Sequence, residues 1–360
     1  MHNIKNLLSP GNTPFYQFSD SNDRTWLIPE RNMAMSMNLY NPKGLWEVLF
    51  KESFPTFHRI PFADKAFRAV RNKYSLNPEV LSIVQKTFGV DNIEFSILGG
   101  NPSDPHRITI LFFKGKKILG YGKVTDNHDV RSLFVKEHIM LDYLKRQGVT
   151  GTPESLLLSQ LKNGNTLSLQ TTEKSAGAFS PEMWMPQHDE FINDMTIRTA
   201  VPVSFLESDF YRHMAELTKH LRQLPSEHRP LISGAMNQVH KKFGVDNYLF
   251  SVFHGDFEPR NMFINNGKLF VTNWEHAELT FPPTLDRYHF LIRQYIHVEH
   301  IPTKEAFGKL REYGWFDADL LRCYLLEMIY RSVCGRNNEL SESTKDIAVW
   351  SRLLFYLSRL

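Results

Sequence analysis

The chain has 360 residues, of which 42% are apolar and 22% charged, and these values are typical of a globular protein with more than one hydrophobic core. The formal net charge of +3 is too small to favour nucleic-acid binding. No run of about 18 apolar residues predicts a transmembrane segment, and residues 1–5 do not begin a signal peptide. Two cysteines, Cys323 and Cys334, are expected to stay reduced, which favours a cytoplasmic protein.

Residues 1–75 give the weakest pattern in the chain. Prolines separate short apolar pieces such as residues 26–28 and 45–50, and no motif there carries chemistry. We expect residues 1–90 to form an N-terminal extension that packs on the lobe that follows. The alternative is that these residues form a surface for a substrate or a partner.

The pattern changes from helix to strand after residue 88. Asn77 followed by Pro78 suits the first turn of a helix, and the spacing of apolar residues extends this helix to residue 88. Short runs of apolar and β-branched residues then predict five strands, and a helix over residues 129–147, closed by Gly148, follows the third strand. The strands are expected at residues 93–98, 107–113, 117–125, 156–161 and 166–171.

Residues 172–178 are expected to connect this small lobe, residues 91–172, to a second lobe of residues 173–360. Apolar residues at helical spacing dominate the second lobe and predict most of its structure. The predicted fold class is therefore α+β, with a small β-rich lobe and a large, mostly helical lobe. The helices are expected at residues 206–224, 232–243, 285–296, 303–313, 318–334 and 343–357.

The most informative stretch is residues 254–261, which reads His-Gly-Asp-Phe-Glu-Pro-Arg-Asn. A predicted strand, residues 248–253, leads into it, and a predicted hairpin follows, with strands at residues 262–264 and 269–272. The turn contains Asn266-Gly267, and both residue types tolerate positive φ angles. An Asp on a loop, an Asn five residues later and a hairpin that ends on a polar residue form the catalytic layout of protein-kinase-like phosphotransferases.

This stretch resembles the family of aminoglycoside phosphotransferases and choline kinases, which phosphorylate hydroxyls of small molecules. The resemblance covers roughly residues 92–300 and is tightest at residues 254–275. It implies a protein-kinase-like bilobal fold, ATP and Mg²⁺ as cofactors, and a small hydroxylated substrate, a sugar or amino sugar ahead of an amino alcohol. It also implies that Asp256 acts as the base or orients the substrate hydroxyl, and that the amide oxygen of Asn261 binds Mg²⁺.

The resemblance also assigns residues of the small lobe to the nucleotide. Lys123, near the end of the third predicted strand, would hold the α- and β-phosphates, and Glu137 in the following helix would orient that lysine. The turn that contains Gly99, Gly100 and Ser103 would cover the phosphates with backbone N–H groups. The alternatives are a solvated lysine, a solvated glutamate and an ordinary hairpin turn.

Two further residues are expected to brace the catalytic loop. His254 would shape the loop from within it, and Asp286 matches the family's later Asp, which holds the loop by hydrogen bonds. A metal-binding or basic role for His254 is the weaker alternative. The alternative for Asp286 is the N-cap of a helix that begins at about this position.

Three residues decide whether the catalytic pattern is complete. Tyr121 shares a face of its strand with Lys123, where protein kinases place a small Ala against adenine. Asn273 stands where the family has an Asp as the main metal ligand, and a unit charge at about 4 Å is worth about 4 kcal/mol at an effective dielectric of about 20. Glu275 would replace that charge if residues 273–275 are extended, because residues two apart then share a face.

The identity of Asn273 leaves three explanations open: an engineered inactivation, a natural variant with a shifted metal ligand, and a pseudokinase. The main hypothesis is an ATP- and Mg²⁺-dependent O-phosphotransferase. The alternative is a non-catalytic nucleotide-binding or scaffold protein that uses residues 1–90 as its partner surface. Asp256 together with Asn261 favours the enzyme, because a scaffold does not need a base. A protein kinase is the weakest hypothesis, because His-Arg-Asp, Asp-Phe-Gly and Ala-Pro-Glu do not occur at their places.

Overall fold

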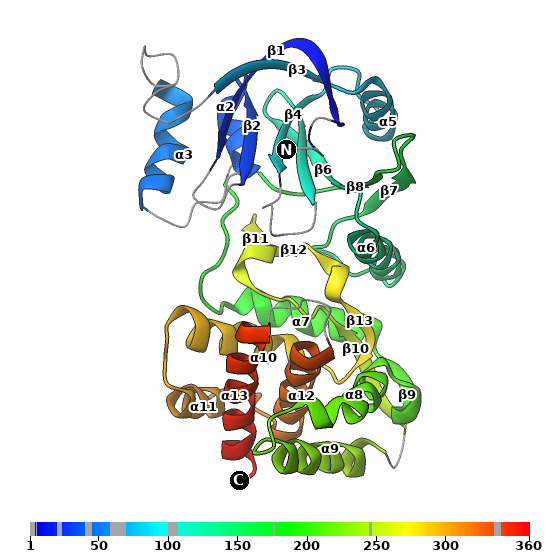
Figure 1. Cartoon of the computed structure of the whole chain (residues 1–360), viewed down its shortest axis with the longest axis vertical. Helices are drawn as coiled ribbons and strands as arrows, with labels where there is room; N and C mark the ends of the chain where they lie inside the picture. The colour runs from blue at the N-terminus through cyan, green and yellow to red at the C-terminus, as the bar shows by residue number, and fades with distance from the viewer. Residues whose placement is uncertain are drawn as a thin grey trace. The chain divides into compact units, whose positions relative to one another are not determined.

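The computed structural model consists of two compact units (Figure 1). The first, the sheet unit, comprises Met1–Tyr143 and Thr152–Ala178, and the second, the helical unit, comprises Leu144–Gly151 and Phe179–Leu360. Within the residues that the structure describes, no helix has both the length and the hydropathy that a bilayer crossing requires. The described residues are 4, 6–19, 24–39, 45–57, 70–99, 107–175, 177–244, 247–334 and 340–360.

One eight-stranded sheet forms the sheet unit, and every neighbouring pair of its strands is antiparallel. The strand order is β3-β1-β2-β4-β5-β6-β8-β7. The five strands predicted from the sequence correspond to β4–β8, and each end agrees to within one residue. The strands are β1 (Leu8–Ser19), β2 (Thr25–Pro29), β3 (Val70–Leu76), β4 (Glu94–Gly99), β5 (Ile108–Lys114), β6 (Lys117–Thr125), β7 (Ser155–Gln160) and β8 (Thr166–Gln170).

The strands β1, β2 and β3 lie where the sequence pattern predicted none. β2 is buried along its whole length, and β1 pairs with both β2 and β3. The pairing of β1 with β3 shifts register between Pro10 and Thr13. Because proline removes a ladder donor and a bulge interrupts the period of two, the alternating pattern of a strand is hidden there. These three strands belong to the same sheet as β4–β8.

Helices pack on the sheet, and one of them begins at its predicted cap. α5 (Pro78–Phe88) has the predicted bounds: Asn77 accepts a hydrogen bond from the N–H of Glu79 at 2.8 Å, and Gly89, with a φ of 65°, ends the helix. Its buried side chains pack with apolar side chains of β5 and β6 in one core cluster. The remaining helices of this unit are α2 (Met33–Ser36), α3 (Leu45–Phe57) and α6 (His128–Arg146).

The helical unit contains a sheet of order β13-β10-β9 and the hairpin of β11 and β12. α12 is its central helix: it is buried over most of its length and contacts α8, α9, α10 and α13. The strands are β9 (Val201–Ser204), β10 (Asn247–Phe253), β11 (Met262–Asn265), β12 (Lys268–Val271) and β13 (Glu278–Phe281). The helices are α7 (Pro186–Thr199), α8 (Asp209–His220), α9 (Arg229–Phe243), α10 (Leu285–Ile292), α11 (Thr303–Arg311), α12 (Ala318–Cys334) and α13 (Leu340–Leu357).

The predicted α+β class is confirmed, and the differences within the helical unit have local causes. The helix predicted at residues 206–224 is interrupted at Ser208, whose hydroxyl caps α8 by accepting a hydrogen bond from Tyr211 N–H at 3.0 Å. The helix predicted at residues 285–296 changes after Ile292 into a π-helix, η6 (Arg293–Val298). The hairpin turn is confirmed, because Asn266 and Gly267 have φ angles of 50° and 77°.

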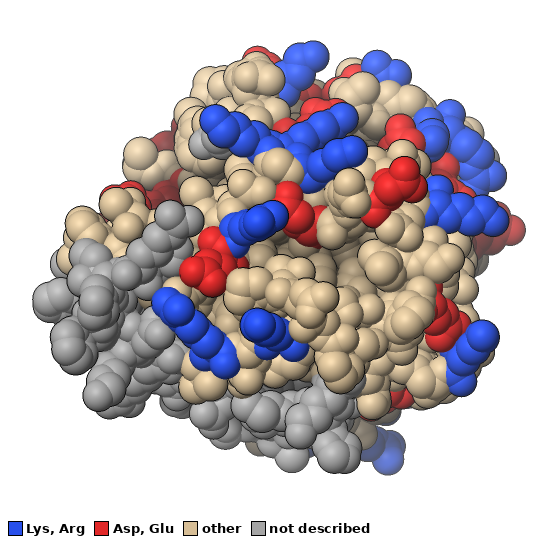
Figure 2. Space-filling model, turned by 90° about the horizontal axis from the view of Figure 1, so that it is seen from above, with Lys and Arg blue, Asp and Glu red and all other residues tan. Residues whose placement is uncertain are grey.

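The surface of the sheet unit carries charges of both signs. Figure 2, which views the molecule from above, shows lysine and arginine side chains standing among aspartates and glutamates. The described part of this face is therefore not a field of one sign, in agreement with the formal net charge of +3.

Candidate active site

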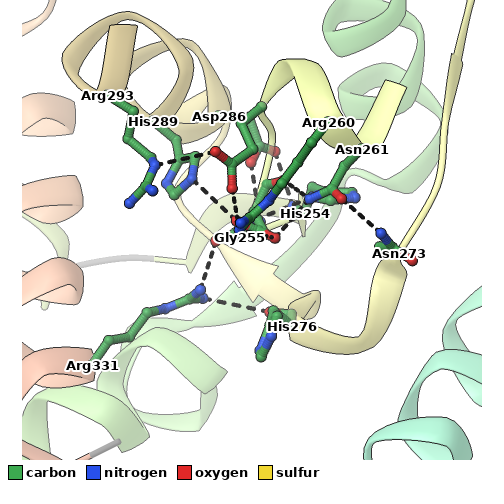
Figure 3. A network of polar contacts seen from close by, with 12 residues as sticks. His254, Gly255, Arg260, Asn261, Asn273, His276, Asp286, His289, Arg293 and Arg331 are labelled. Carbon is green, nitrogen blue, oxygen red and sulfur yellow. Dashed lines mark hydrogen bonds and ion pairs between the residues drawn. The ribbon is translucent and has the colours of Figure 1, made fainter. Parts of the chain in front are cut away.

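The stretch 254–261 forms a loop after β10 and ends in a 3₁₀ turn, η4 (Pro259–Asn261). Asp286 in the first turn of α10 holds the start of this loop: its Oδ2 accepts from His254 N–H at 2.9 Å and its Oδ1 from Gly255 N–H at 3.1 Å (Figure 3). The N-cap residue of α10 is Thr284, so Asp286 serves the loop and not its own helix. Burial raises the pKa of Asp286 to about 7, although the two N–H donors oppose this shift.

His254 connects the loop to the end of the hairpin. Its Nε2–H donates to the carbonyl oxygen of Thr272 at 3.0 Å, and its Nδ1 accepts from the N–H of Asp256 at 3.1 Å. These two bonds require the neutral ring with the proton on Nε2. Burial lowers the pKa of His254 to about 4, which keeps the ring neutral at physiological pH. Both ring nitrogens of His254 are thus hydrogen-bonded to backbone groups.

Gly255 is required by its conformation and by its neighbours. Its φ is 79°, in the left-handed region, and a Cβ atom there would lie 2.6 Å from Arg331 Nη2 and 2.7 Å from the carbonyl oxygen of His276. Real Cβ contacts are longer than these distances, so a larger residue would displace the loop. The glycine therefore lets Arg331 approach the loop.

Asp256 is surrounded by donors. Asn261 Nδ2 donates to its Oδ2 at 2.6 Å, Arg260 Nη2 lies 3.3 Å from both carboxylate oxygens, and His289 Nε2 lies 3.8 Å from Oδ1. Burial works to raise the pKa of Asp256, but the neighbouring His289, Glu258 and Arg260 outweigh burial, and the pKa lies well below its usual range. The carboxylate is therefore ionised at neutral pH and able to accept a hydrogen bond from a hydroxyl.

A second carboxylate, Glu258, stands next to Asp256 and is held by two guanidinium groups. Arg260 contacts Oε1, and Arg293 Nε from η6 lies 3.4 Å from Oε2. Burial and the charge of Asp256 raise the pKa of Glu258 to about 7. When both carboxylates are ionised, the charges of Asp256, Glu258, Arg260 and Arg293 balance.

Asn261 links Asp256 to Asn273. The Nδ2 of Asn261 also donates to the carbonyl oxygen of Asp256 at 2.8 Å, and its Oδ1 accepts from Asn273 Nδ2 at 2.7 Å. Asn273 has left-handed backbone angles, with φ 64° and ψ 61°, a conformation that Asn and Asp adopt more readily than other residues. The two amide groups therefore face each other at the end of the hairpin.

These two amides fit a Mg²⁺ ion. A half-turn of the Asn273 amide would place its oxygen beside Asn261 Oδ1, and Mg²⁺ prefers oxygen ligands. Within the described residues, no group of three or more His, Cys, Asp and Glu side chains forms a metal cluster. An ion at this position would therefore take most of its ligands from phosphates and water, as Mg²⁺ does in phosphotransferases.

The premise on which Glu275 was expected to replace the missing carboxylate is wrong. Residues 273–275 are not extended, because Asn273 is left-handed and Trp274–His276 form the 3₁₀ turn η5. Side chains two positions apart share a face only in an extended chain. Glu275 is buried, and its Oε1 lies 3.7 Å from His276 Nε2.

Arg331, which the sequence did not single out, contacts both sides of the site. Its Nη1 donates to the carbonyl oxygen of Gly255 at 2.7 Å, and its Nη2 to that of His276 at 3.4 Å (Figure 3). Its Nε donates to Glu327 Oε1 at 2.6 Å, and Glu327 Oε2 lies 2.8 Å from His213 Nδ1. The available signal was a Glu and an Arg four residues apart in a helix.

His289 and Arg293 were also missed, although their spacing carries a signal. Asp286, His289 and Arg293 stand at positions i, i+3 and i+7, which share one helix face. Asp286 accepts from the N–H groups of residues 254 and 255. His289 lies beside Asp256, and Arg293 lies beside Glu258. One face of α10 and η6 thus supplies three polar contacts to the loop.

In the sheet unit, Lys123 and Glu137 form a buried ion pair. Lys123 Nζ on β6 lies 2.8 Å from both Oε1 and Oε2 of Glu137 on α6. The side chains are 9% and 0% exposed, so these residues are not solvated surface charges. Because β6 is paired with β5 and β8, the position of the lysine is fixed by two ladders.

Four other residues of the sheet unit were discussed for nucleotide binding, namely Tyr121, Gly99, Gly100 and Ser103. The ring of Tyr121 packs against a cluster that includes Leu39 and Leu111, and burial raises its pKa. Gly99 is the last residue of β4, and a Cβ atom there would lie 2.5 Å from Ile4 Cδ1. Gly100 and Ser103 lie outside the described residues.

No protein-family model matches the chain, and no curated protein matches it. Among solved structures, aminoglycoside phosphotransferase APH(4)-Ia is similar over 78% of this chain and 98% of its own, at 13% identity and a TM-score of 0.51. A thermostable mutant of that enzyme, in a ternary complex with AMP-PNP and hygromycin B, has the same coverage at 14% identity and a TM-score of 0.52. At these identities the likeness shows the fold alone. The chain has the fold of aminoglycoside phosphotransferases, as the resemblance of residues 254–261 implied.

Proposed function

We propose that the chain is an ATP-dependent O-phosphotransferase that transfers the γ-phosphate to a hydroxyl of a small molecule, a sugar or amino sugar. The observation that carries the proposal is the ionised Asp256 on a loop held by Asp286, His254 and Arg331, with Asn261 hydrogen-bonded to it. A loop with so many fixed contacts holds one carboxylate in one place, and phosphoryl transfer depends on such positioning.

Asp256 is the base or the orienting group of this proposal. Its low pKa makes it a weak base, so its main role is to accept a hydrogen bond from the acceptor hydroxyl and direct an oxygen lone pair at the phosphorus. As the bond from the hydroxyl oxygen to the γ-phosphorus forms, the bond to the β-phosphate oxygen breaks and ADP leaves, and the hydroxyl proton passes to Asp256. Asp286 and His254 act through the loop and are positioning residues.

Asn261 and Asn273 are the proposed ligands of Mg²⁺. Glu275 is a further candidate, although residues 273–275 are not extended as its first assignment required. When bound, Mg²⁺ neutralises negative charge on the phosphates. Both amide oxygens are neutral, so we expect the ion to bind with the nucleotide and not before it.

Lys123 and Glu137 are the proposed nucleotide-binding pair. The glutamate holds the ammonium group of the lysine, and that group then donates to the α- and β-phosphates. Gly99, Gly100 and Ser103 remain the proposed phosphate-covering turn. The packed ring of Tyr121 and the neutral Asn273 favour the second candidate, a catalytically impaired nucleotide-binding or scaffold protein.

The charges beside Asp256 bear on the acceptor. Arg260 and Arg293 balance Asp256 and Glu258, so the loop does not present the excess of negative charge that a polycation would require. Within the class of sugars and amino sugars, this favours acceptors with few positive charges. In the described residues Cys323 and Cys334 are free thiols, which supports the proposal of a cytoplasmic protein.

The test is product formation from Mg²⁺·ATP and a panel of sugars, amino sugars, amino alcohols and hygromycin B, with the chain and its Asp256→Ala variant. We expect phosphorylated product from the parent and a loss of about 10²- to 10⁴-fold in kcat in the variant. The matched control is Asp194→Ala, which removes an exposed carboxylate that pairs with Arg198. Absence of product from the whole panel would favour the scaffold, and equal turnover of parent and Asp256→Ala would remove Asp256 from the reaction.

A further inference from the structure

His289 is buried beside the proposed catalytic carboxylate without a hydrogen bond. Its side chain is 5% exposed, and its Nε2 lies 3.8 Å from Asp256 Oδ1. Within the described residues, neither of its ring nitrogens has a hydrogen-bond partner. A buried polar group that is left without a partner costs about 1–3 kcal/mol, so its presence requires an explanation.

The groups around the His289 ring include one hydrogen-bond acceptor within reach, Asp256. The ring of Tyr324 from α12 meets it edge to face, with centroids 6.0 Å apart and an interplanar angle of 85°. The charged and titratable groups that face it are Asp256 and His254 from the loop, Arg293 from η6 and Arg331 from α12. Among these groups Asp256 is the hydrogen-bond acceptor within reach of Nε2.

We propose that His289 is a positioning residue for Asp256, and that its Nε2–H donates to Asp256 Oδ1 when nucleotide and acceptor are bound. This inference rests on the proposed function. A normal N–H···O bond is about 2.7–3.2 Å long, so the two atoms, 3.8 Å apart, have to approach by about 0.6–1.1 Å. Hydrogen bonds of catalytic groups are often long before the ligands bind and shorten in the complex.

The two carboxylate oxygens of Asp256 have different partners, and this difference explains why His289 is needed as a donor. Asn261 holds Oδ2 at 2.6 Å, whereas Oδ1 has Arg260 at 3.3 Å, and the arginine side chain is 62% exposed. An acceptor hydroxyl that binds at Oδ1 would compete with this exposed arginine. His289 then remains as the buried donor on Oδ1, and because burial lowers its pKa to about 4, it donates without adding a positive charge.

The test compares two variants of His289. His289→Phe keeps a ring of similar size and removes the donor, and His289→Gln keeps an N–H donor. In Mg²⁺·ATP turnover, with an accepted sugar or with water as the acceptor, we expect His289→Phe to lower kcat by about 10- to 100-fold. The KM for ATP should stay within about twofold, and His289→Gln should recover a large part of the loss.

The control is His297→Phe, which makes the same chemical change on η6 at a ring that lies 6.0 Å from the ring of Trp350. We expect its kcat to equal that of the parent. Equal losses in His289→Phe and His297→Phe, or a His289→Gln variant as slow as His289→Phe, would overturn the proposal, because a structural role alone would then explain them.

A second readout does not depend on turnover. In spectra of the full chain labelled with ¹⁵N-histidine, with Mg²⁺·AMP-PNP and a sugar of the panel present, His289 is expected to carry its proton on Nε2, and its signals should shift in Asp256→Asn. A proton on Nδ1, or signals unchanged in Asp256→Asn, would overturn the inference. A parent that transfers no phosphate contradicts the proposed function instead, and the spectra still decide the role of His289.

Discussion

Arg331 gives the sharpest prediction for the stability of the site. Its guanidinium group donates to the carbonyl oxygens of Gly255 and His276, and its Nε pairs with Glu327, whose side chain is fully buried. Arg331→Met keeps an unbranched side chain and removes the charge. Glu327 then keeps one partner, His213, at 2.8 Å.

The expected cost follows from burial. Removal of one partner of a buried ion pair destabilises a protein by about 3–5 kcal/mol, because a charge stays buried without compensation. An exposed pair contributes about 0–1 kcal/mol. The chain offers such a pair for comparison: Arg198 Nε lies 2.7 Å from Asp194 Oδ1, also four residues apart on a helix, but its side chains are 43% and 41% exposed.

Urea unfolding followed by tryptophan fluorescence measures both effects. We expect Arg331→Met to lower the free energy of unfolding by about 3–5 kcal/mol, and Arg198→Met by at most about 1 kcal/mol. The double variant Arg331→Met/Glu327→Leu should recover part of the loss, because no carboxylate is then left buried, although His213 loses its 2.8 Å contact with Glu327. The reasoning is refuted if Arg331→Met costs no more than Arg198→Met.

Three further predictions concern other parts of the structure. Lys123→Met should weaken ATP binding by about 10- to 100-fold in calorimetry, since a charged donor to phosphate is lost, whereas Lys117→Met, at the exposed start of the same strand, should not. Gly255→Ala should destabilise the chain by about 1–3 kcal/mol more than Gly267→Ala; both glycines have φ near 78°, but no atom lies within 4 Å of a Cβ at Gly267. The pKa of His289 is lowered to about 4 from 6.5, so the neutral ring adds stability above pH 6.5 that is lost as the pH falls toward 4. Between pH 6.5 and about pH 5 the free energy of unfolding should fall by about 2 kcal/mol more in the parent than in His289→Gln; equal slopes would contradict this.

Local signals predicted most of the secondary structure. α5, β6 and α12 have the predicted bounds, because a cap, a glycine turn and a long apolar period each lie within a few residues of the element. β1–β3 were missed because their pairing is decided by distant strands: Tyr16 of β1 lies opposite Arg71 of β3. Prolines within β1 also hide the alternation that one strand would show alone.

The residues of the candidate site also fall into those that a local pattern predicted and those that only the fold brings together. Asp256 and Asn261 stand five residues apart on one loop, so a short pattern is enough to predict them. Arg331 contacts the carbonyl oxygen of Gly255 across 76 residues, and a backbone carbonyl leaves no trace in the sequence. His289 was visible only as part of a helix face, because the sequence does not show which element that face contacts.

The most direct test of the account is phosphoryl transfer by the parent and by Asn273→Asp, with Mg²⁺ titrated at a fixed ATP concentration. The added carboxylate stands next to Asn261 Oδ1, where we propose the metal binds. We predict tighter Mg²⁺·ATP binding in calorimetry and faster product formation in Asn273→Asp than in the parent, since a unit charge is restored at the ion. If Asn273→Asp binds no Mg²⁺·ATP, the phosphotransferase account is contradicted, because binding must precede transfer.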